Sequence, residues 1–290
     1  MTTATYSATE AQHKKLNDLK DYFAKLDGVA IAFSGGVDST FLLAVAHEVL
    51  DSKALAVTAH CSTLSAAEKG EPERFCAAHG IECIAFESRE MSVPQFVANP
   101  PERCYICKKA IFGDIIAIAR EHGMSAVAEG SNASDEGDYR PGFKAIAELG
   151  VLSPLRVCRL TKDDIRALSR EMNLPTWDKP SLACLASRFP YGAPITAEGI
   201  RMVDEAESFL RGRGMENVRV RIVGNEARIE VPPSDFPAIT DQPLRSDIVR
   251  VFKEIGFVYV SLDLAGFRSG AMNEALDAGK RSAWIPETAR

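Results

Sequence analysis

The chain has 290 residues and a formal net charge of −6, a length that suits one large domain and one small domain. Close to half of the residues are apolar and about a quarter are charged, as in an ordinary globular protein. The acidic balance argues against a protein that binds polyanions with its whole surface, although a single cleft can still be basic. No apolar run is long enough to span a membrane, and the first 20 residues lack the apolar core of a signal peptide.

The first 190 residues alternate short apolar runs with helical patterns. Four runs predict buried strands, at 28–33, 54–60, 81–87 and 125–130. Longer stretches predict helices at 39–50, 66–80, 107–123 and 160–175, the last with Thr161 as its N-cap. Strands alternating with helices predict a parallel sheet, so the expected fold class is α/β.

The pattern changes near residue 190. The remaining chain predicts a helix over 196–214, a β-hairpin with a Gly-Asn turn over 218–231, a helix over 244–256 and a strand over 257–264. We therefore expect an α/β domain over 1–190 and a small α+β domain over 191–290. The tail after Leu264 is expected to be loose.

The stretch AIAFSGGVDST (30–40) carries the strongest functional signal. Two glycines follow a strand, so the backbone can turn tightly and approach a ligand, and the next helix offers unpaired N–H groups at its N-terminus. Together with the hydroxyl groups they form a cradle for phosphate; an ordinary glycine turn is the alternative. The cradle residues are Ser34, Gly35, Gly36, Ser39 and Thr40.

This stretch resembles the S-G-G-x-D-S pyrophosphate loop (PP-loop) of ATP pyrophosphatases, which split ATP between the α- and β-phosphates. The resemblance implies that the protein binds ATP and Mg²⁺. It also implies that Asp38 helps to hold the magnesium ion.

Other strand ends should complete the nucleotide site, because open α/β sheets bind ligands outside the carboxyl ends of their strands. For the candidates in the loop 129–142, a turn-forming residue in a solvated loop is an equally good explanation. The candidates are Thr58, His60, Ser131, Asn132 and Asp135. Arg140 has a guanidinium fork that suits a phosphate or a carboxylate, with a surface salt bridge as the alternative.

Three cysteines are candidates for chemistry. Cys104 and Cys107 form a C-x-x-C on a loop expected to run into a helix, and Cys184 lies four residues before Arg188. A nearby cation lowers the pKa of a thiol and makes it more nucleophilic. From the residues alone, the C-x-x-C could be a redox pair, part of a zinc or iron–sulfur site, or two inert thiols.

The remaining four cysteines fall in strand or helix patterns and are expected in the core: Cys61, Cys76, Cys83 and Cys158. Seven cysteines in such a chain indicate a reducing compartment, where thiols are free or bound to metal. A cytoplasmic location is therefore expected.

Taken together, several segments resemble the LarE family of ATP-dependent sulfur transferases over nearly the whole chain. They are the PP-loop, RCYICKK (103–109), DYRPG (138–142), WDKPSLACLASRFPYG (177–192) and RIE (228–230). The resemblance implies adenylylation and thiolation of the carboxylates of a pyridinium dicarboxylate mononucleotide, a precursor of the nickel-pincer nucleotide cofactor of lactate racemase. It also implies a small-molecule nucleotide substrate and a homo-oligomer, a hexamer.

The resemblance implies two possible sulfur sources. Three cysteines could hold a 4Fe–4S cluster whose open iron carries an extra sulfide, or Cys184 alone could give up its own sulfur. Zinc and inert thiols remain as alternatives. The implied catalytic set is Cys104, Cys107, Cys184, Asp38, Ser187 and Arg188.

The small domain is expected to bind the substrate phosphate. Arg219 and Arg221 share one strand face, and Arg228 and Glu230 share a face on the partner strand. A ladder of cross-strand ion pairs explains this pattern equally well. The resemblance implies substrate contacts from Arg140, Arg188, Arg219 and Arg221, and metal ligands from the three cysteines, Glu207 and Glu230.

Three other functions are alternatives to a LarE-like sulfur transferase. A tRNA thiolase would need a basic, aromatic-rich RNA-binding module, and its absence argues against a nucleic-acid partner. An amidotransferase-type synthetase would leave the three cysteines unexplained. A non-catalytic protein that binds AMP or ATP through the same loop would release no pyrophosphate.

Overall fold

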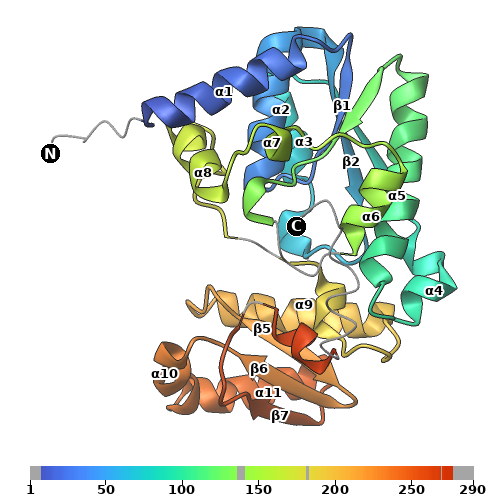
Figure 1. Ribbon diagram of the computed structural model, residues 1–290. Helices are drawn as coiled ribbons and strands as arrows, with labels where there is room; N and C mark the ends of the chain where they lie inside the picture. The colour runs from blue at the N-terminus through green and yellow to red at the C-terminus, as the bar shows by residue number, and fades with distance from the viewer. Residues whose placement is uncertain (1–7, 136–140, 181–182, 269, 277–290) are drawn as a thin grey trace, which may run out of the picture.

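The computed structural model describes residues 8–135, 141–180, 183–268 and 270–276. They form a larger domain and a smaller domain, one above the other and joined by the link that precedes α9 (Figure 1). None of the helices in this part of the chain is long and apolar enough to cross a membrane.

The larger domain is built on a four-stranded sheet in the order β3-β2-β1-β4. Its strands are Val29–Ala32 (β1), Ala54–His60 (β2), Cys83–Glu87 (β3) and Ala126–Ala128 (β4). All pairings are parallel, as the alternating pattern predicts. β1 lies inside the sheet and its first three residues are fully buried. This burial on both faces explains why the sequence of the strand is a continuous apolar run.

Helices cover both faces of this sheet (Figure 1). The helices are α1 (Glu10–Phe23), α2 (Val37–Leu50), α3 (Glu71–His79), α4 (Pro94–Val97), α5 (Arg103–Glu121), α6 (Gly142–Glu148), α7 (Pro154–Val157) and α8 (Lys162–Glu171). α1, α2 and α8 share one apolar core, which contains Phe23 and Phe41, while α5 and α6 form a second core around Phe112. The predicted fold class is therefore correct.

Two helices differ from their predicted bounds. The stretch 66–80 divides into a short 3₁₀ turn (Ala66–Glu68) and α3, because Gly70 has φ +74° and Pro72 has no N–H to continue a helix. α5 begins at Arg103 rather than 107, so Cys104 and Cys107 lie in its first two turns and not on a loop. The helix α1 follows a Thr9–Gln12 capping box, which the sequence reading did not use.

The smaller domain packs α9 (Ala197–Arg211), α10 (Phe236–Thr240) and α11 (Leu244–Ile255) around a three-stranded sheet in the order β5-β6-β7. β5 (Arg219–Val223) and β6 (Glu226–Glu230) form the predicted hairpin, and β7 (Tyr259–Leu262) pairs parallel to β6. The core of this domain also contains Leu185, Phe189 and Phe96, which precede the expected boundary at residue 190.

The chain beyond Leu264 packs back on the smaller domain. The backbone N–H of Phe267 donates to the carbonyl of Val231 at 2.9 Å, and Leu276 is buried. A short 3₁₀ helix, η7, covers Ala271–Ala275. The expectation of a loose tail is therefore wrong for the described part of this segment, and residues 277–290 lie outside the described residues.

Candidate active site

A cavity of about 620 Å³ opens at the carboxyl ends of β1, β2 and β4, where a parallel sheet is expected to bind its ligand. We call it the nucleotide cavity. Most of the predicted nucleotide residues line it: Ser34, Gly36, Asp38, Ser39, Thr58, Ser131 and Asn132. Gly35 and Thr40 instead line a separate cavity of about 550 Å³ that also includes residues of α3.

The loop between β1 and α2 has the geometry of a phosphate cradle. Gly35 has φ +70°, a conformation that favours glycine, and Gly36 caps α2 without any side-chain hydrogen bond. The first N–H groups of α2 therefore remain open to an anion. Ser39 Oγ donates to the carbonyl of Gly36 at 3.2 Å and lies 3.1 Å from Ser34 Oγ, so the two hydroxyl groups brace the turn.

Gly130 brings the loop after β4 directly against this cradle. A Cβ at this position would lie 3.0 Å from the backbone nitrogen of Ser39, closer than side chains normally approach. A glycine is thus required where the two walls of the cavity meet.

Asp38 has two oxygens in different surroundings. Its Oδ2 accepts a hydrogen bond from Lys162 Nζ at 2.7 Å, whereas its buried Oδ1 has no partner among the described residues. An unpartnered carboxylate oxygen beside a phosphate cradle fits a Mg²⁺ ion bound to the polyphosphate. Lys162, the first residue of α8, was not predicted from the sequence, because it lies 124 positions from Asp38 and no local pattern connects the two residues.

Two residues predicted to bind the nucleotide, Thr58 and His60, make side-chain contacts with other protein groups. Thr58 Oγ1 donates to the carbonyl of Phe33 at 2.9 Å, which ties β2 to the end of β1. His60 contacts Glu73 and Glu87, and the hydrogen bond to Glu73 is the main cause that raises the pKa of His60. Both residues line the nucleotide cavity, but neither hydroxyl nor imidazole is free of protein contacts.

Glu129, at the end of β4, organises the opposite wall. This buried carboxylate accepts hydrogen bonds from Ser131 Oγ and from Ser153 Oγ, both at 2.6 Å, and lies 4.0 Å from Lys108 Nζ. Asn132 accepts from the backbone of Ser134 at 2.9 Å. Glu129 and Lys108 were not singled out by the sequence reading, although both stand inside stretches that it quoted.

The candidate cysteines gather near the first turns of α5. Cys104 and Cys107 are one helical turn apart, and the backbone of Leu185, next to Cys184, donates to the carbonyl of Thr63 at 2.8 Å. Burial raises the pKa of the Cys107 thiol, and the neighbouring thiols of Cys184, Cys61 and Cys104 raise it further. These three thiols therefore lie near enough to Cys107 to influence its pKa.

Cys61 is consequently not the core residue that the sequence suggested. It is half-buried, lines the nucleotide cavity and has a pKa raised to about 12 by burial, by Glu90 and by Cys184. Of the other three, Cys76 is buried as expected, while Cys83 and Cys158 are only partly buried. Within the described ranges, no three His, Cys, Asp or Glu side chains are arranged to hold a metal ion.

Arg188 holds the backbone around Cys184 and not its thiol. Its guanidinium is almost completely buried and donates to the carbonyl of Ala183 at 2.9 Å and to Ser187 Oγ at 2.7 Å. It also binds both oxygens of Glu207, at 2.7 and 2.8 Å. Arg188 thus fixes the turn that presents Cys184.

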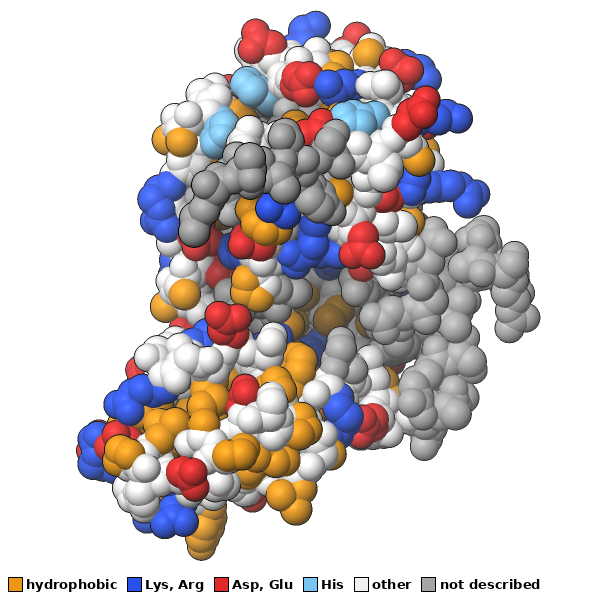
Figure 2. All heavy atoms as spheres, turned by 90° about the vertical axis from the view of Figure 1, so that its left-hand side faces the viewer, with side chains coloured by type: hydrophobic (Ala, Val, Ile, Leu, Met, Phe, Trp, Pro, Cys, Tyr) orange, Lys and Arg blue, Asp and Glu red, His pale blue; other side chains and the backbone are white. Residues whose placement is uncertain are grey.

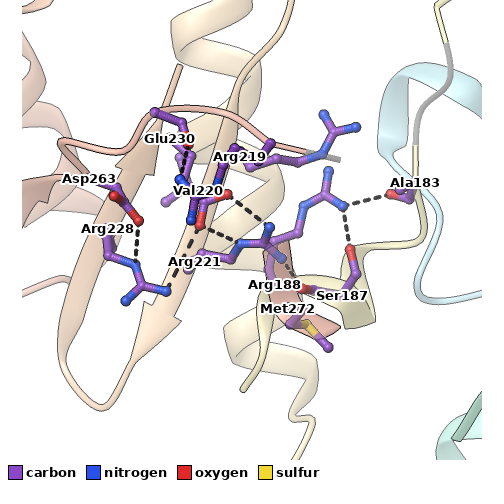
Figure 3. Close-up of polar contacts among 12 residues, drawn as sticks. Ala183, Ser187, Arg188, Arg219, Val220, Arg221, Arg228, Glu230, Asp263 and Met272 are labelled. Atoms are coloured by element: carbon purple, nitrogen blue, oxygen red, sulfur yellow. Dashed lines mark hydrogen bonds and ion pairs between the residues drawn. The ribbon is translucent and has the colours of Figure 1, made fainter. Parts of the chain in front are cut away.

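Arg219 and Arg221 project from β5 toward this turn (Figure 3). Arg221 binds both oxygens of Glu230, at 2.9 and 2.8 Å, and donates to the carbonyl of Ser187. Burial, together with the charge of Arg188, lowers the pKa of Arg219 to about 10. Cations held this close together are stabilised by a bound anion.

The two predicted acidic metal ligands are held by arginines. Glu207 is fully buried and accepts from Arg188, from Arg211 and from the backbone of Val220 at 3.0 Å. Glu230 accepts both of its bonds from Arg221. Each carboxylate is therefore already neutralised, and among the described contacts neither offers an open pair of oxygens to a metal ion.

A second cavity, of about 270 Å³, lies between the arginines and the first turn of α5; we call it the arginine cavity. Its wall includes Arg103, Cys104, Ser187, Tyr191, Arg219, Arg221, Arg268 and parts of η7. In the space-filling view the molecule is hollowed between its two domains (Figure 2). Arg140, a predicted substrate residue, lies outside the described residues.

The parallel sheet and the uncapped cradle at its carboxyl edge define an ATP-dependent enzyme of the PP-loop superfamily. The chain is 37% identical over 255 residues to the pyridinium-3,5-bisthiocarboxylic acid mononucleotide synthase of Lactiplantibacillus plantarum, covering 87% of this chain and 91% of that protein. This chain belongs to the same family, the LarE family of sulfur transferases.

The chain is also similar to other proteins. An uncharacterized protein of Synechocystis sp. is 40% identical and covers 90% of this chain and 98% of its own length. A glutamine-hydrolyzing GMP synthase component of Pyrococcus abyssi is 26% identical, covering 90% of this chain and 87% of that protein. No protein-family model matches the chain.

Proposed function

We propose that the protein uses ATP to activate a carboxylate of a pyridinium dicarboxylate mononucleotide and converts it to a thiocarboxylate. The observation that carries the proposal is that one helix contributes residues to the walls of both cavities. α5 places Cys104 in the arginine cavity and, one turn later, Lys108 in the nucleotide cavity. A substrate held by the arginines would therefore present its reacting end toward ATP and the cysteines.

The nucleotide cavity supports the first chemical step. The triphosphate binds at the open N-terminus of α2, and Lys162 lies where it can balance the developing negative charge. A substrate carboxylate oxygen attacks the α-phosphorus, the bond to the α,β-bridging oxygen breaks, and pyrophosphate leaves. When bound, Mg²⁺ would neutralise charge on the polyphosphate, held by the open oxygen of Asp38.

The arginine cavity supports substrate binding. Arg219 and Arg221 hold the 5′-phosphate, because guanidinium groups bind phosphate oxygens with charge-assisted hydrogen bonds. Ser187 and Arg188 fix the turn that carries Cys184 beside this site. A sulfur nucleophile then attacks the acyl carbon, the bond to AMP breaks, and AMP leaves.

The sulfur source divides the proposal into two forms. In the first, Cys104, Cys107 and Cys184 hold a 4Fe–4S cluster, which when bound would supply the extra sulfide. The gathering of their thiols supports this donor set, although the described side chains would have to turn toward one another to hold a metal. In the second, Cys184 forms a thioester and loses its own sulfur, which leaves dehydroalanine.

We also propose that the protein is cytoplasmic and forms a homo-oligomer, a hexamer. Light scattering of the purified protein would test the oligomeric state.

The test of the ATP step is pyrophosphate release in the presence of pyridinium-3,5-biscarboxylic acid mononucleotide. The wild type should release pyrophosphate and form a thiocarboxylate, whereas Asp38→Asn should release little while keeping its unfolding temperature. Lys253→Met, a change on the small-domain helix α11, serves as the control. A wild type that releases no pyrophosphate with this compound, or an Asp38→Asn variant as fast as the wild type, would refute the proposal.

A further inference from the structure

Arg103, the first residue of α5, is an unusual arginine in the wall of the arginine cavity. Its exposed fraction is 5%, so the charge is held away from bulk water. The arginines that flank the same region are paired: Arg221 with Glu230, and Arg268 with Glu274 on the outer side. Arg103 has no such carboxylate partner among the described residues, and its charge has to be explained.

The described contacts of Arg103 include no carboxylate; besides the thiol of its neighbour Cys104, they are with uncharged groups. One terminal nitrogen donates to Asn99 Oδ1 at 2.7 Å, and the other approaches Met272 Sδ at 3.9 Å. The guanidinium carbon lies 4.9 Å from the ring centre of Tyr191. In the described part of the chain no carboxylate lies within ion-pair distance of it, and a thioether is only a weak acceptor. A buried cation with five N–H donors and no carboxylate partner is costly to keep.

The protein nevertheless builds a rigid support for this cation. Asn99 is fully buried with φ +54°. Its side-chain nitrogen donates to the carbonyls of Phe189, Pro190 and Ala193, at 3.3, 2.7 and 3.0 Å. The side-chain oxygen is thereby turned toward Arg103, which fixes the guanidinium before any ligand arrives. A preorganised charge of this kind is typical of a binding site.

We propose that Arg103 binds a carboxylate of the substrate, at the ring end, while Arg219 and Arg221 bind the phosphate. This inference rests on the proposed function. The position supports it, because Arg103 directly precedes Cys104, lies one helical turn before Cys107 and lines the arginine cavity together with Cys104. The planar guanidinium matches a carboxylate with two parallel hydrogen bonds, and Tyr191 beneath it restricts the orientation.

A dicarboxylate substrate gives this residue a clear task. While one carboxylate is converted to the acyl adenylate, the other stays anionic and would otherwise be buried without a partner. Arg103 neutralises it and sets the rotation of the ring, so that the reacting carboxylate faces the nucleotide cavity. Arg103 is thus a substrate-binding residue that distinguishes a dicarboxylate from a ring without carboxylates.

The experiment compares two ligands that share the ring, ribose and phosphate. One is pyridinium-3,5-biscarboxylic acid mononucleotide, and the other is nicotinamide mononucleotide, which has no carboxylate. Their binding to the wild type, Arg103→Met and Arg103→Lys is measured by calorimetry with a non-hydrolysable ATP analogue. Arg250→Ala, on the outer helix α11, is the control. Loss of a charge-assisted pair predicts roughly tenfold to hundredfold weaker binding of the dicarboxylate to Arg103→Met.

The expected pattern is selective. Nicotinamide mononucleotide should bind all variants alike, Arg103→Lys should recover part of the dicarboxylate affinity, and pyrophosphate release should show a raised KM with a smaller change in kcat. Equal weakening of both ligands would assign Arg103 to the phosphate or to the fold and overturn the inference. Unchanged binding of both would also overturn it while leaving the proposed function intact. A wild type that binds no dicarboxylate would refute the function itself.

Discussion

Asp164 shows how one residue links the N-terminal helix to the rest of the larger domain. Its Oδ2 accepts from Lys15 Nζ of α1 at 2.6 Å, and the same carboxylate closes the capping box of α8 with Thr161. Burial alone would raise its pKa, but the bonds from Lys15, Thr161 and Gln12 outweigh burial and lower the pKa from 3.8 to about 2. The ionised form is therefore favoured by the fold.

The pH dependence follows from the sign of this shift. Because the pKa is lower in the folded state, the stabilisation is present above the usual value near 4 and is lost as the pH falls toward 2. Asp164→Asn should lower the free energy of unfolding by about 2 kcal/mol at most at pH 7. The difference from the wild type should shrink between pH 4 and pH 2, as measured by urea unfolding.

A matched comparison uses the partner lysines. Lys15→Met should lower the free energy of unfolding almost as much as Asp164→Asn does. Lys20→Met should lower it little, because Lys20 pairs with Glu48 on the surface. If the free energies of unfolding of Asp164→Asn and the wild type differed by the same amount at every pH, the carboxylate would act through its shape and not through its charge.

The cysteines give the second prediction at the scale of single residues. If Cys104, Cys107 and Cys184 hold one cluster, changing any of them to Ala should remove most of the iron and the visible absorbance of anaerobically reconstituted protein, because two thiolates hold a cluster poorly. The wild type should then make more than one product per chain when sulfide is supplied. Cys76→Ala, in the core beyond the site, is the control.

The sacrificial form predicts a different result from the same variants. Only Cys184→Ala would be inactive, turnover would stop at one sulfur per chain, and the intact mass would fall by one hydrogen sulfide, about 34 Da. Reconstituted wild type with that mass loss, beside fully active Cys104→Ala and Cys107→Ala, would contradict the cluster. Cys61→Ala tests whether the fourth thiol of this region takes part in either route.

The residue scale is also where sequence reasoning was least complete. The PP-loop residues could be predicted because glycines, hydroxyls and a helix start follow one another along the chain. Lys162 contacts Asp38 from 124 positions away, a distance that no local pattern encodes. Glu207 looked like a metal ligand in the sequence, but its carboxylate is bound by Arg188, since a fully buried charge needs a partner.

At the scale of elements, the link before Cys184 is attached to the PP-loop. Lys179 Nζ donates to the carbonyl of Gly35 at 3.1 Å and to Glu71 of α3 at 2.5 Å, and the lysine side chain is 17% exposed. Arg166 of α8 holds the same link through the carbonyls of Trp177 and Lys179. Residues 177–179 of the link are thus fixed to the PP-loop and to α8.

We therefore expect Lys179 to act as a positioning residue for ATP. Lys179→Met keeps the apolar stem but leaves the Gly35 carbonyl and the Glu71 carboxylate without their donor. A lost hydrogen bond to a charged group predicts an increase in the KM for ATP of roughly tenfold or more, with binding of the mononucleotide unchanged. Lys179→Arg should recover part of the affinity. A lower unfolding temperature with an unaltered KM for ATP would mean that Lys179 serves only the fold.

Elements were predicted best where the local signal and the tertiary environment agree. The four parallel strands and the hairpin of the smaller domain follow directly from apolar runs and from the Gly-Asn turn. The start of α5 was misplaced because two prolines precede it and no capping side chain marks it. The segment 265–276 was misjudged because its packing depends on a backbone bond to Val231, which lies far from it in sequence.

At the scale of the whole molecule, the residues proposed to bind the two ligands lie in separate domains. The nucleotide cavity belongs to the larger domain, and Arg219 and Arg221 belong to β5 of the smaller domain. The turn around Ser187 joins them, since Arg221 donates to its backbone carbonyl. Substitutions in the smaller domain should therefore separate binding of the mononucleotide from binding of ATP.

Arg219→Ala tests this division most directly. Burial and the charge of Arg188 lower the pKa of Arg219, which disfavours its charged form, so the free protein should tolerate its removal. Binding of the mononucleotide should weaken about thirtyfold, corresponding to a charge-assisted phosphate contact of about 2 kcal/mol. Binding of ATP, measured by calorimetry without substrate, should stay at the wild-type value.

Arg221→Ala should be compared with Arg219→Ala. It also removes one positive charge, but in addition it leaves Glu230 buried without its partner. It should weaken mononucleotide binding and lower the unfolding temperature, whereas Arg219→Ala should weaken binding alone. Arg221→Ala with Glu230→Gln should recover stability without recovering affinity. If both single variants bound the mononucleotide as tightly as the wild type, the arginines would be a cross-strand ion-pair ladder, and the phosphate site would have to lie elsewhere.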